Sequence, residues 1–109
     1  MNKKYKRIVV KVGSTLITHN SDGLSTKVMT QLIQQIDHLI SIHIEVILVS
    51  SGAVAAGRQV LNSTDESINV KLKQVFAAVG QSVLMNKYSK LFEHYGLKVA
   101  QTLLTRADF

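Results

Sequence analysis

Lys11, Gly13 and Ser14 follow one another closely in the segment "RIVVKVGSTLIT", residues 7–18. The lysine interrupts an apolar run, and the glycine and serine come directly after it. Glycine lets the backbone approach a ligand without an intervening Cβ, and the amide and hydroxyl groups that follow can point at an anion. We interpret the segment as a candidate phosphate site. Lys11 alone is equally compatible with a strand lysine whose stem packs while its ammonium reaches solvent, and Gly13 with a plain tight turn.

A second set of small and hydroxyl residues opens the segment "SSGAVAAG", residues 50–57. Ser51, Gly52 and Ala53 follow another apolar run at the point where a helix is expected to begin. The first N–H groups of a helix have no partner within it and lie at the positive end of its dipole, so they favour a carboxylate or a phosphate. The alternative is structural, with Ser51 as an N-cap and the small residues as a close helix-to-sheet contact.

The apolar spacing indicates which elements position these residues. We expect strands at 8–12, 44–49 and 97–105, the first two buried on both faces, and helices at 25–42, from Ser51 or Gly52 onward, and at 70–92 as one helix or as two joined near Gly80. This alternation is typical of a parallel α/β sheet. Ligands bind such sheets beyond the carboxyl ends of the strands, where the two candidate segments lie.

Composition narrows the class of protein. The 109 residues suit one small domain, with 46% hydrophobic and 18% charged residues and no cysteine. No segment has the length and apolar character of a secretory signal or a membrane span, which favours a cytoplasmic protein without a membrane partner. The formal net charge of +6 is spread without interleaved aromatics, so nucleic-acid binding is not favoured. The histidines have no metal-ligand spacing, and the sequence predicts no metal site.

Four segments carry a resemblance to a known family. In this order, "VVKVGSTLIT", "ILVSSGAVAAGR", "KQVFAAVGQSVLM" and "QTLLTRADF" resemble the N-terminal part of the kinase domain in the glutamate 5-kinase branch of the amino acid kinase family. The match runs over nearly the whole chain. The resemblance implies a three-layer αβα sandwich with a mainly parallel sheet, of which residues 1–109 form an incomplete N-terminal portion. It also implies ATP and Mg²⁺ as cofactors and a homo-oligomer.

The function implied by the resemblance is ATP-dependent phosphorylation of the side-chain carboxylate of L-glutamate to L-glutamyl 5-phosphate, the first step of proline biosynthesis. Lys11 then matches the lysine that contacts the ATP phosphates and the transferred group. Gly13 and Ser14 match the turn beside those phosphates. Ser51, Gly52 and Ala53 match the loop that holds glutamate.

The sequence departs from the family pattern at its end. The adenine pocket, a second catalytic lysine, the residues that orient substrate and magnesium, and an RNA-binding-like C-terminal domain present in many members all lie beyond the matched region. We therefore expect these 109 residues to be inactive alone. Arg106 and Asp108, at the end of the third expected strand, fit either a site role or a mutual ion pair. Two alternatives stay open, namely a family member with a different acceptor and a non-catalytic fragment that only self-associates.

Overall fold

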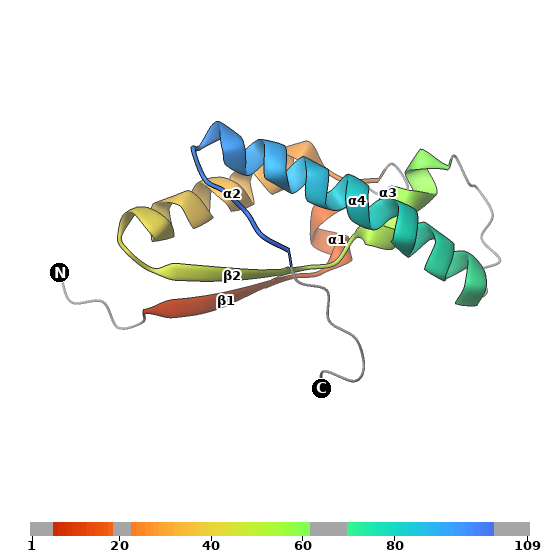
Figure 1. Ribbon diagram of the computed structural model, residues 1–109, viewed down its shortest axis with the longest axis horizontal. Helices are drawn as coiled ribbons and strands as arrows, with labels where there is room; N and C mark the ends of the chain where they lie inside the picture. Colours follow the sequence, from red (N-terminus) through yellow and green to blue (C-terminus); the bar gives the residue numbers. More distant parts are fainter. Residues whose placement is uncertain (1–5, 19–22, 62–69, 102–109) are drawn as a thin grey trace.

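A computed structural model describes residues 6–18, 23–61 and 70–101 of the chain, and Figure 1 shows their arrangement. The elements in chain order are β1 (Arg7–Val12), α1 (Ser14–Ile17), α2 (Thr26–Ser41), β2 (Glu45–Ser50), α3 (Ala53–Val60) and α4 (Val70–His94). The predicted order of strands and helices is confirmed through α4, except that the short helix α1 was not predicted. Arg106 and Asp108 lie outside the described residues.

The two strands pair in parallel, as the alternating pattern predicts. The register places Val12 beside Ser50 at their carboxyl ends. The Ser51 N–H then donates to the Val12 carbonyl oxygen at 2.9 Å, which continues the ladder one residue past β2. Because parallel strands end at the same edge of a sheet, the segments that follow β1 and β2 begin side by side.

Helix α2 forms the crossover between the strands and agrees with the predicted span to within one residue at each end. Ser25 is its N-cap, and the serine hydroxyl accepts a hydrogen bond from the Val28 N–H at 3.3 Å. Met29, Ile33 and Ile36 are buried on one face of the helix. Their spacing of four and three residues is the helical period, so one apolar stripe faces the core.

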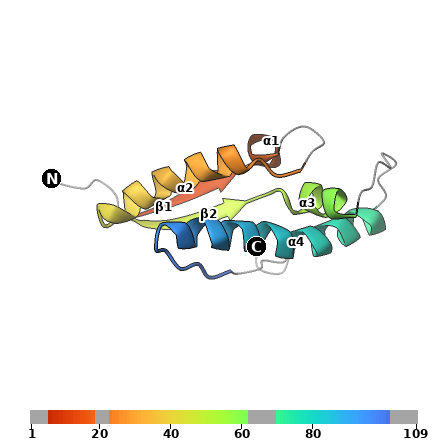
Figure 2. The same cartoon turned by 90° about the horizontal axis from the view of Figure 1, so that it is seen from above.

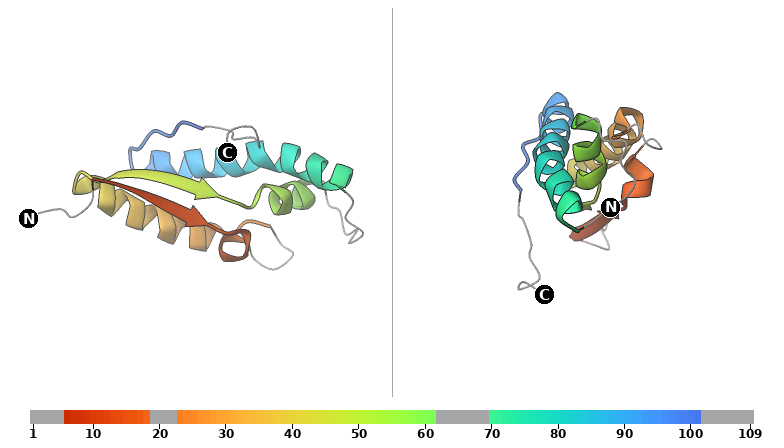
Figure 3. Two further views of the ribbon diagram at one scale, coloured as in Figure 1. Left: turned by 90° about the horizontal axis from the view of Figure 1, so that it is seen from below. Right: turned by 90° about the vertical axis from the view of Figure 1, so that its right-hand side faces the viewer.

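The helices cover one face of the sheet, as Figures 2 and 3 show. On the covered face Val12 is 1% exposed, whereas Val9 and Ile47 on the other face are 62% and 47% exposed. The prediction that both strands are buried on both faces is therefore wrong for this structure. Successive side chains of a strand point to opposite faces, and among the described residues the helices pack on one face only. The result is a sheet with one helical layer, in agreement with an N-terminal portion of the αβα sandwich.

The third predicted strand, 97–105, is not confirmed for the part of it that the structure describes. Residues 97–101 form no strand, and 102–105 lie outside the described residues. After α4, Gly96 adopts a φ of +73°, and the Leu97 N–H donates to the Phe92 carbonyl oxygen at 3.0 Å. This closes the helix as its glycine predicted. Residues 97–101 make no ladder with β1 or β2, and strand-forming residues need such a partner to become a strand.

Helix α4 is continuous through Gly80, which settles the choice between one helix and two. A Cβ on Gly80 would overlap the Ala53 carbonyl oxygen, and a Cβ on Gly57 would overlap the Phe76 carbonyl oxygen. The glycines thus let the backbones of α3 and α4 lie almost in contact, antiparallel to each other. This packing fixes the start of α3 at the end of β2.

Gly80→Ala is expected to lower the free energy of unfolding by about 2 kcal/mol or more, because the added methyl group must push α3 and α4 apart. Urea denaturation measures this loss. Ser82→Ala, at an exposed position of the same helix, is the control and should change stability little. Since alanine has the higher helix propensity, a more stable Gly80→Ala variant would show that the two helices do not need this close approach.

Candidate functional site

The carboxyl ends of β1 and β2 open onto one cleft of about 440 Å³. The residues that line it are Ser14, Ser51, Gly52, Ala53, Val54, Ala55, Arg58 and Lys73. The structure therefore brings Ser14, from the predicted phosphate turn, together with the three predicted substrate-loop residues. They come from segments nearly forty positions apart in the chain, and the parallel pairing of the strands joins them.

Gly52 has a structural requirement of its own. Its φ of +116° lies in the left-handed region, and a Cβ there would approach the Ile17 Cδ1 atom at 2.9 Å. Gly52 is also the N-cap of α3 and supplies no side-chain cap. The structural alternative for Ser51 as N-cap is therefore wrong, because its neighbour occupies that position. The first N–H groups of α3 lie along the cleft without a side-chain cap, as an anion site at a helix start requires.

Gly13, unlike Gly52, has no conformation or close contact that requires a glycine. Its backbone, with φ of −76° and ψ of 158°, is extended and accessible to any residue. Apart from Gly13 itself and its two chain neighbours, no heavy atom of the described residues lies within 4 Å of the position that a Cβ would take. Neither backbone strain nor packing within the described residues therefore accounts for a glycine here. The open space beside this turn is what a close ligand approach needs.

Lys11 does not lie in a buried strand, contrary to the premise of the sequence interpretation. Its side chain is exposed, and its neighbour Val12 faces the core. The alternation of a strand puts Lys11 on the uncovered face of the sheet with Val9. It is not among the residues that line the cleft. The role predicted for Lys11 therefore stays a prediction, and its distance of two residues from Gly13 is the feature that supports it.

Two cations that the sequence analysis did not single out line the cleft. Arg58 projects from the second turn of α3 and Lys73 from the first turn of α4. The Arg58 guanidinium lies over the Phe76 ring, 5.3 Å from its centroid. Spacing gives a partial signal for Arg58, because it follows Val54 by four positions on one helix face. Lys73 has no such signal, since only the packing of α4 on α3 brings it to the cleft.

Tyr88 of α4 contacts the end of β2 from the side of the core. The Ser50 hydroxyl and the Tyr88 hydroxyl are 2.7 Å apart, and Tyr88 is 2% exposed. Burial raises the pKa of Tyr88, and the hydrogen bond with Ser50 lowers it by a smaller amount. The contact holds the residue that directly precedes Ser51, so it helps to set the position of the loop.

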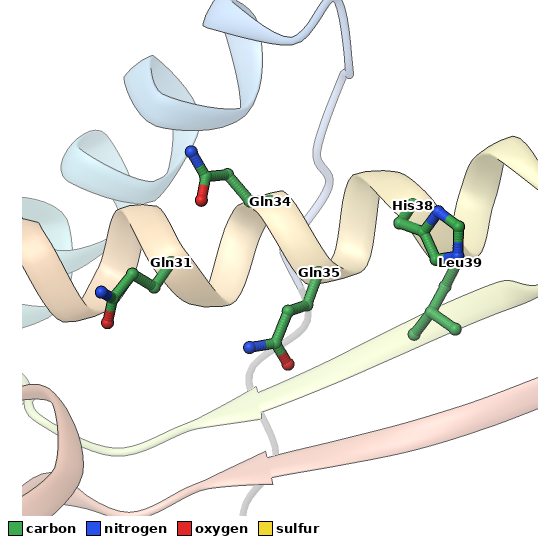
Figure 4. Close-up of a pocket in the computed structure, with 5 residues that line it drawn as sticks. All are labelled: Gln31, Gln34, Gln35, His38 and Leu39. Atoms are coloured by element: carbon green, nitrogen blue, oxygen red, sulfur yellow. The ribbon is translucent and has the colours of Figure 1, made fainter.

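A second pocket lies along α2, lined by Gln31, Gln34, Gln35, His38 and Leu39 (Figure 4). It contains none of the predicted site residues, and its lining is the polar side of an amphipathic helix. In the part of the chain that the structure describes, no group of three or more His, Asp or Glu residues is placed to hold a metal ion. None of the described helices is long and apolar enough to cross a membrane.

Comparison with known proteins gives a family match and many related sequences. Residues 6–109 match the amino acid kinase family. A protein of Caldanaerobacter subterraneus named glutamate 5-kinase is 48% identical over 103 residues, or 94% of this chain. Proteins of the same name from Citrifermentans bemidjiense and Dehalococcoides mccartyi are each 49% identical, over 97% and 95% of this chain. The chain spans about 28% of the length of each of these relatives.

The raised pKa of Tyr88 leads to a prediction on alkaline stability. The folded chain holds the phenolic proton more tightly than the unfolded chain, so this contribution is complete below the ordinary tyrosine pKa of about 10 and is lost as pH rises above it. The free energy of unfolding should therefore fall more steeply in the original chain than in Tyr88→Phe as pH rises above about 10.

At neutral pH Tyr88→Phe should cost about 1 kcal/mol through the lost hydrogen bond to Ser50. Urea denaturation across the pH range measures both effects, and Tyr95→Phe is the matched control. Parallel pH profiles for the original chain and Tyr88→Phe would contradict the prediction.

Proposed function

The chain belongs to the amino acid kinase family, and we propose that it forms the N-terminal portion of a kinase domain that phosphorylates the side-chain carboxylate of L-glutamate. The product is L-glutamyl 5-phosphate, and the reaction is the first step of proline biosynthesis. The relatives named glutamate 5-kinase support the choice of acceptor. The observation that carries the proposal is the cleft in which Ser14 of the phosphate turn meets Ser51, Gly52 and Ala53 of the substrate loop.

The reaction needs alignment more than acid–base chemistry. A glutamate side chain has an ordinary pKa of about 4.3 and is already ionised at neutral pH, so no base has to activate it. One carboxylate oxygen bonds to the γ-phosphorus of ATP, while the bond from that phosphorus to the β–γ bridging oxygen breaks and ADP leaves. In this proposal the Gly13 and Ser14 turn lies against the phosphates, Lys11 neutralises charge on the transferred group, and Ser51, Gly52 and Ala53 hold the acceptor.

Several parts of the proposal rest on the resemblance alone. ATP is the phosphoryl donor implied for the family, and Mg²⁺ would supply positive charge to its phosphates. The described residues offer no carboxylate cluster for that ion, so we assign it no protein ligand in this chain. Assembly into a homo-oligomer and a cytoplasmic location also stay predictions. A family member with another acceptor is the alternative, and parallel assays with glutamate, aspartate and carbamate separate the two.

We expect the 109-residue chain to form no acyl phosphate when incubated alone with ATP, Mg²⁺ and L-glutamate, because it spans about 28% of the length of the relatives named glutamate 5-kinase. Hydroxylamine converts acyl phosphate to a coloured hydroxamate, which measures the product. The positive counterpart is a hybrid in which this chain replaces the matching segment of the Citrifermentans bemidjiense relative. Product from the chain alone would refute its inactivity, and a folded hybrid without glutamate-dependent product would refute the proposed function.

In the same hybrid, Lys11→Ala should lower turnover by about 10²- to 10³-fold, because a preorganised cation at the developing charge is removed. The fall should appear in kcat with a smaller change in the KM for glutamate. Lys27→Ala removes an exposed lysine at the start of α2 and is the matched control. Equal turnover in the two variants would exclude Lys11 from phosphoryl transfer.

A further inference from the structure

Resting on the proposed function, we propose that Arg58 and Lys73 form the recognition site for the non-reacting α-carboxylate of the amino-acid acceptor. Both side chains line the same cleft as Ser51, Gly52 and Ala53, although they come from different helices. Among the described residues that line this cleft there is no carboxylate, so the two positive charges have no counterion there. A bound anion supplies the missing charge.

Arg58 has a hydrogen-bond donor without a partner among the described residues. Its Nε atom is buried and has no hydrogen-bond partner in the part of the chain that the structure describes. A buried N–H that lacks a partner is costly, and such groups are satisfied in nearly all native proteins. The Phe76 ring lies against the guanidinium, 5.3 Å from ring centroid to Cζ. Because Nε is buried, a carboxylate in the cleft would accept hydrogen bonds from the two terminal nitrogens of Arg58.

Lys73 is brought to the cleft by the glycine contacts between α3 and α4. Ala53 lies against Gly80, and Gly57 against Phe76, so the helices run antiparallel. Continuing that register places the first turn of α4 beside the second half of α3. Lys73 therefore reaches the cleft from the side of Arg58 and not from the side of the strand ends. Its neighbour Lys71 is exposed and does not line the cleft.

The position of the two cations selects which carboxylate they hold. Ser14 and the expected phosphates lie at the end of β1, whereas Arg58 follows the first residue of α3 by five positions, or about 7 Å along a helix axis. The two carboxyl carbons of extended glutamate are about 5 Å apart, since four C–C bonds of about 1.5 Å join them. The γ-carboxylate can thus face the phosphates while the α-carboxylate meets the cations. This arrangement also leaves the attacking oxygens without a strong ion pair that would reduce their nucleophilicity.

Nuclear magnetic resonance titration of the ¹⁵N-labelled chain tests the assignment directly. L-Glutamate should shift the amide signals of Gly52, Ala53 and Val54 in a saturable manner. L-Glutamine keeps the α-carboxylate and should shift the same signals, whereas L-isoglutamine, whose α-carboxylate is an amide, should bind about 10- to 100-fold more weakly. Arg58→Gln and Lys73→Gln should each weaken glutamate and glutamine binding by a similar factor and leave isoglutamine binding unchanged.

Lys71→Gln is the matched control and should bind glutamate as the original chain does. Arg58→Lys keeps the charge and should recover part of the affinity, which a purely structural role of Arg58 in packing on Phe76 would not produce. Thermal unfolding of each variant shows whether it is folded, and Lys73→Gln tests the assignment even where an Arg58 variant is unstable.

The assignment is overturned if L-glutamate gives no saturable shifts in the original chain, or if isoglutamine binds as tightly as glutamate and responds equally to the substitutions. It is also overturned if pyrophosphate, and not glutamate or glutamine, depends on Arg58 and Lys73, because the cations then belong to the phosphates. Failure of the proposed function has a different signature. In that case the hybrid kinase forms no acyl phosphate, while α-carboxylate binding by the chain still depends on both cations.

Discussion

The site depends on the parallel pairing of β1 with β2. Pairing in this direction requires a crossover, which α2 supplies, and it places both carboxyl ends at one edge of the sheet. The Ser51 N–H to Val12 carbonyl hydrogen bond then holds the first residue after β2 against the last residue of β1. Without this alignment the Gly13 turn and the Ser51 loop would have no reason to share a cleft. The proximity of Ser14 to Ser51, Gly52 and Ala53 in the cleft follows from it.

The contact between α3 and α4 forms the second side of the cleft. Gly57 and Gly80 remove the side chains that would otherwise separate the helices, and the backbones of α3 and α4 therefore lie against each other. This contact places Arg58 and Lys73 along a loop built from small residues, while Tyr88 holds Ser50 from the core side. Small residues thus set the shape of the cleft and long cations supply its charge. Arg58 follows the small residues on α3, whereas Lys73 comes from α4 and reaches the cleft only through the packing of the two helices.

Local patterns were sufficient for much of the fold. The four-and-three spacing of Met29, Ile33 and Ile36 predicts α2 to within one residue at each end. Patterns failed where an element depends on its neighbours. Residues 97–101 have strand-forming character but no strand to pair with among the described residues. The apolar runs of β1 and β2 indicate burial on both faces, yet the helices that the structure describes cover only one of them.

The sequence by itself determined the class of fold and the family, because these depend on local period and motif. It also predicted the site residues at the strand ends from turn chemistry and motif, namely Lys11, Gly13, Ser14, Ser51, Gly52 and Ala53. Tertiary structure alone decided which of them share a cleft. It grouped Ser14 with Ser51, Gly52 and Ala53, left Lys11 on the uncovered face, and brought in Arg58 and Lys73. The physical reason is that a strand's alternation and a helix crossing orient side chains, and neither can be read until the partner elements are in place.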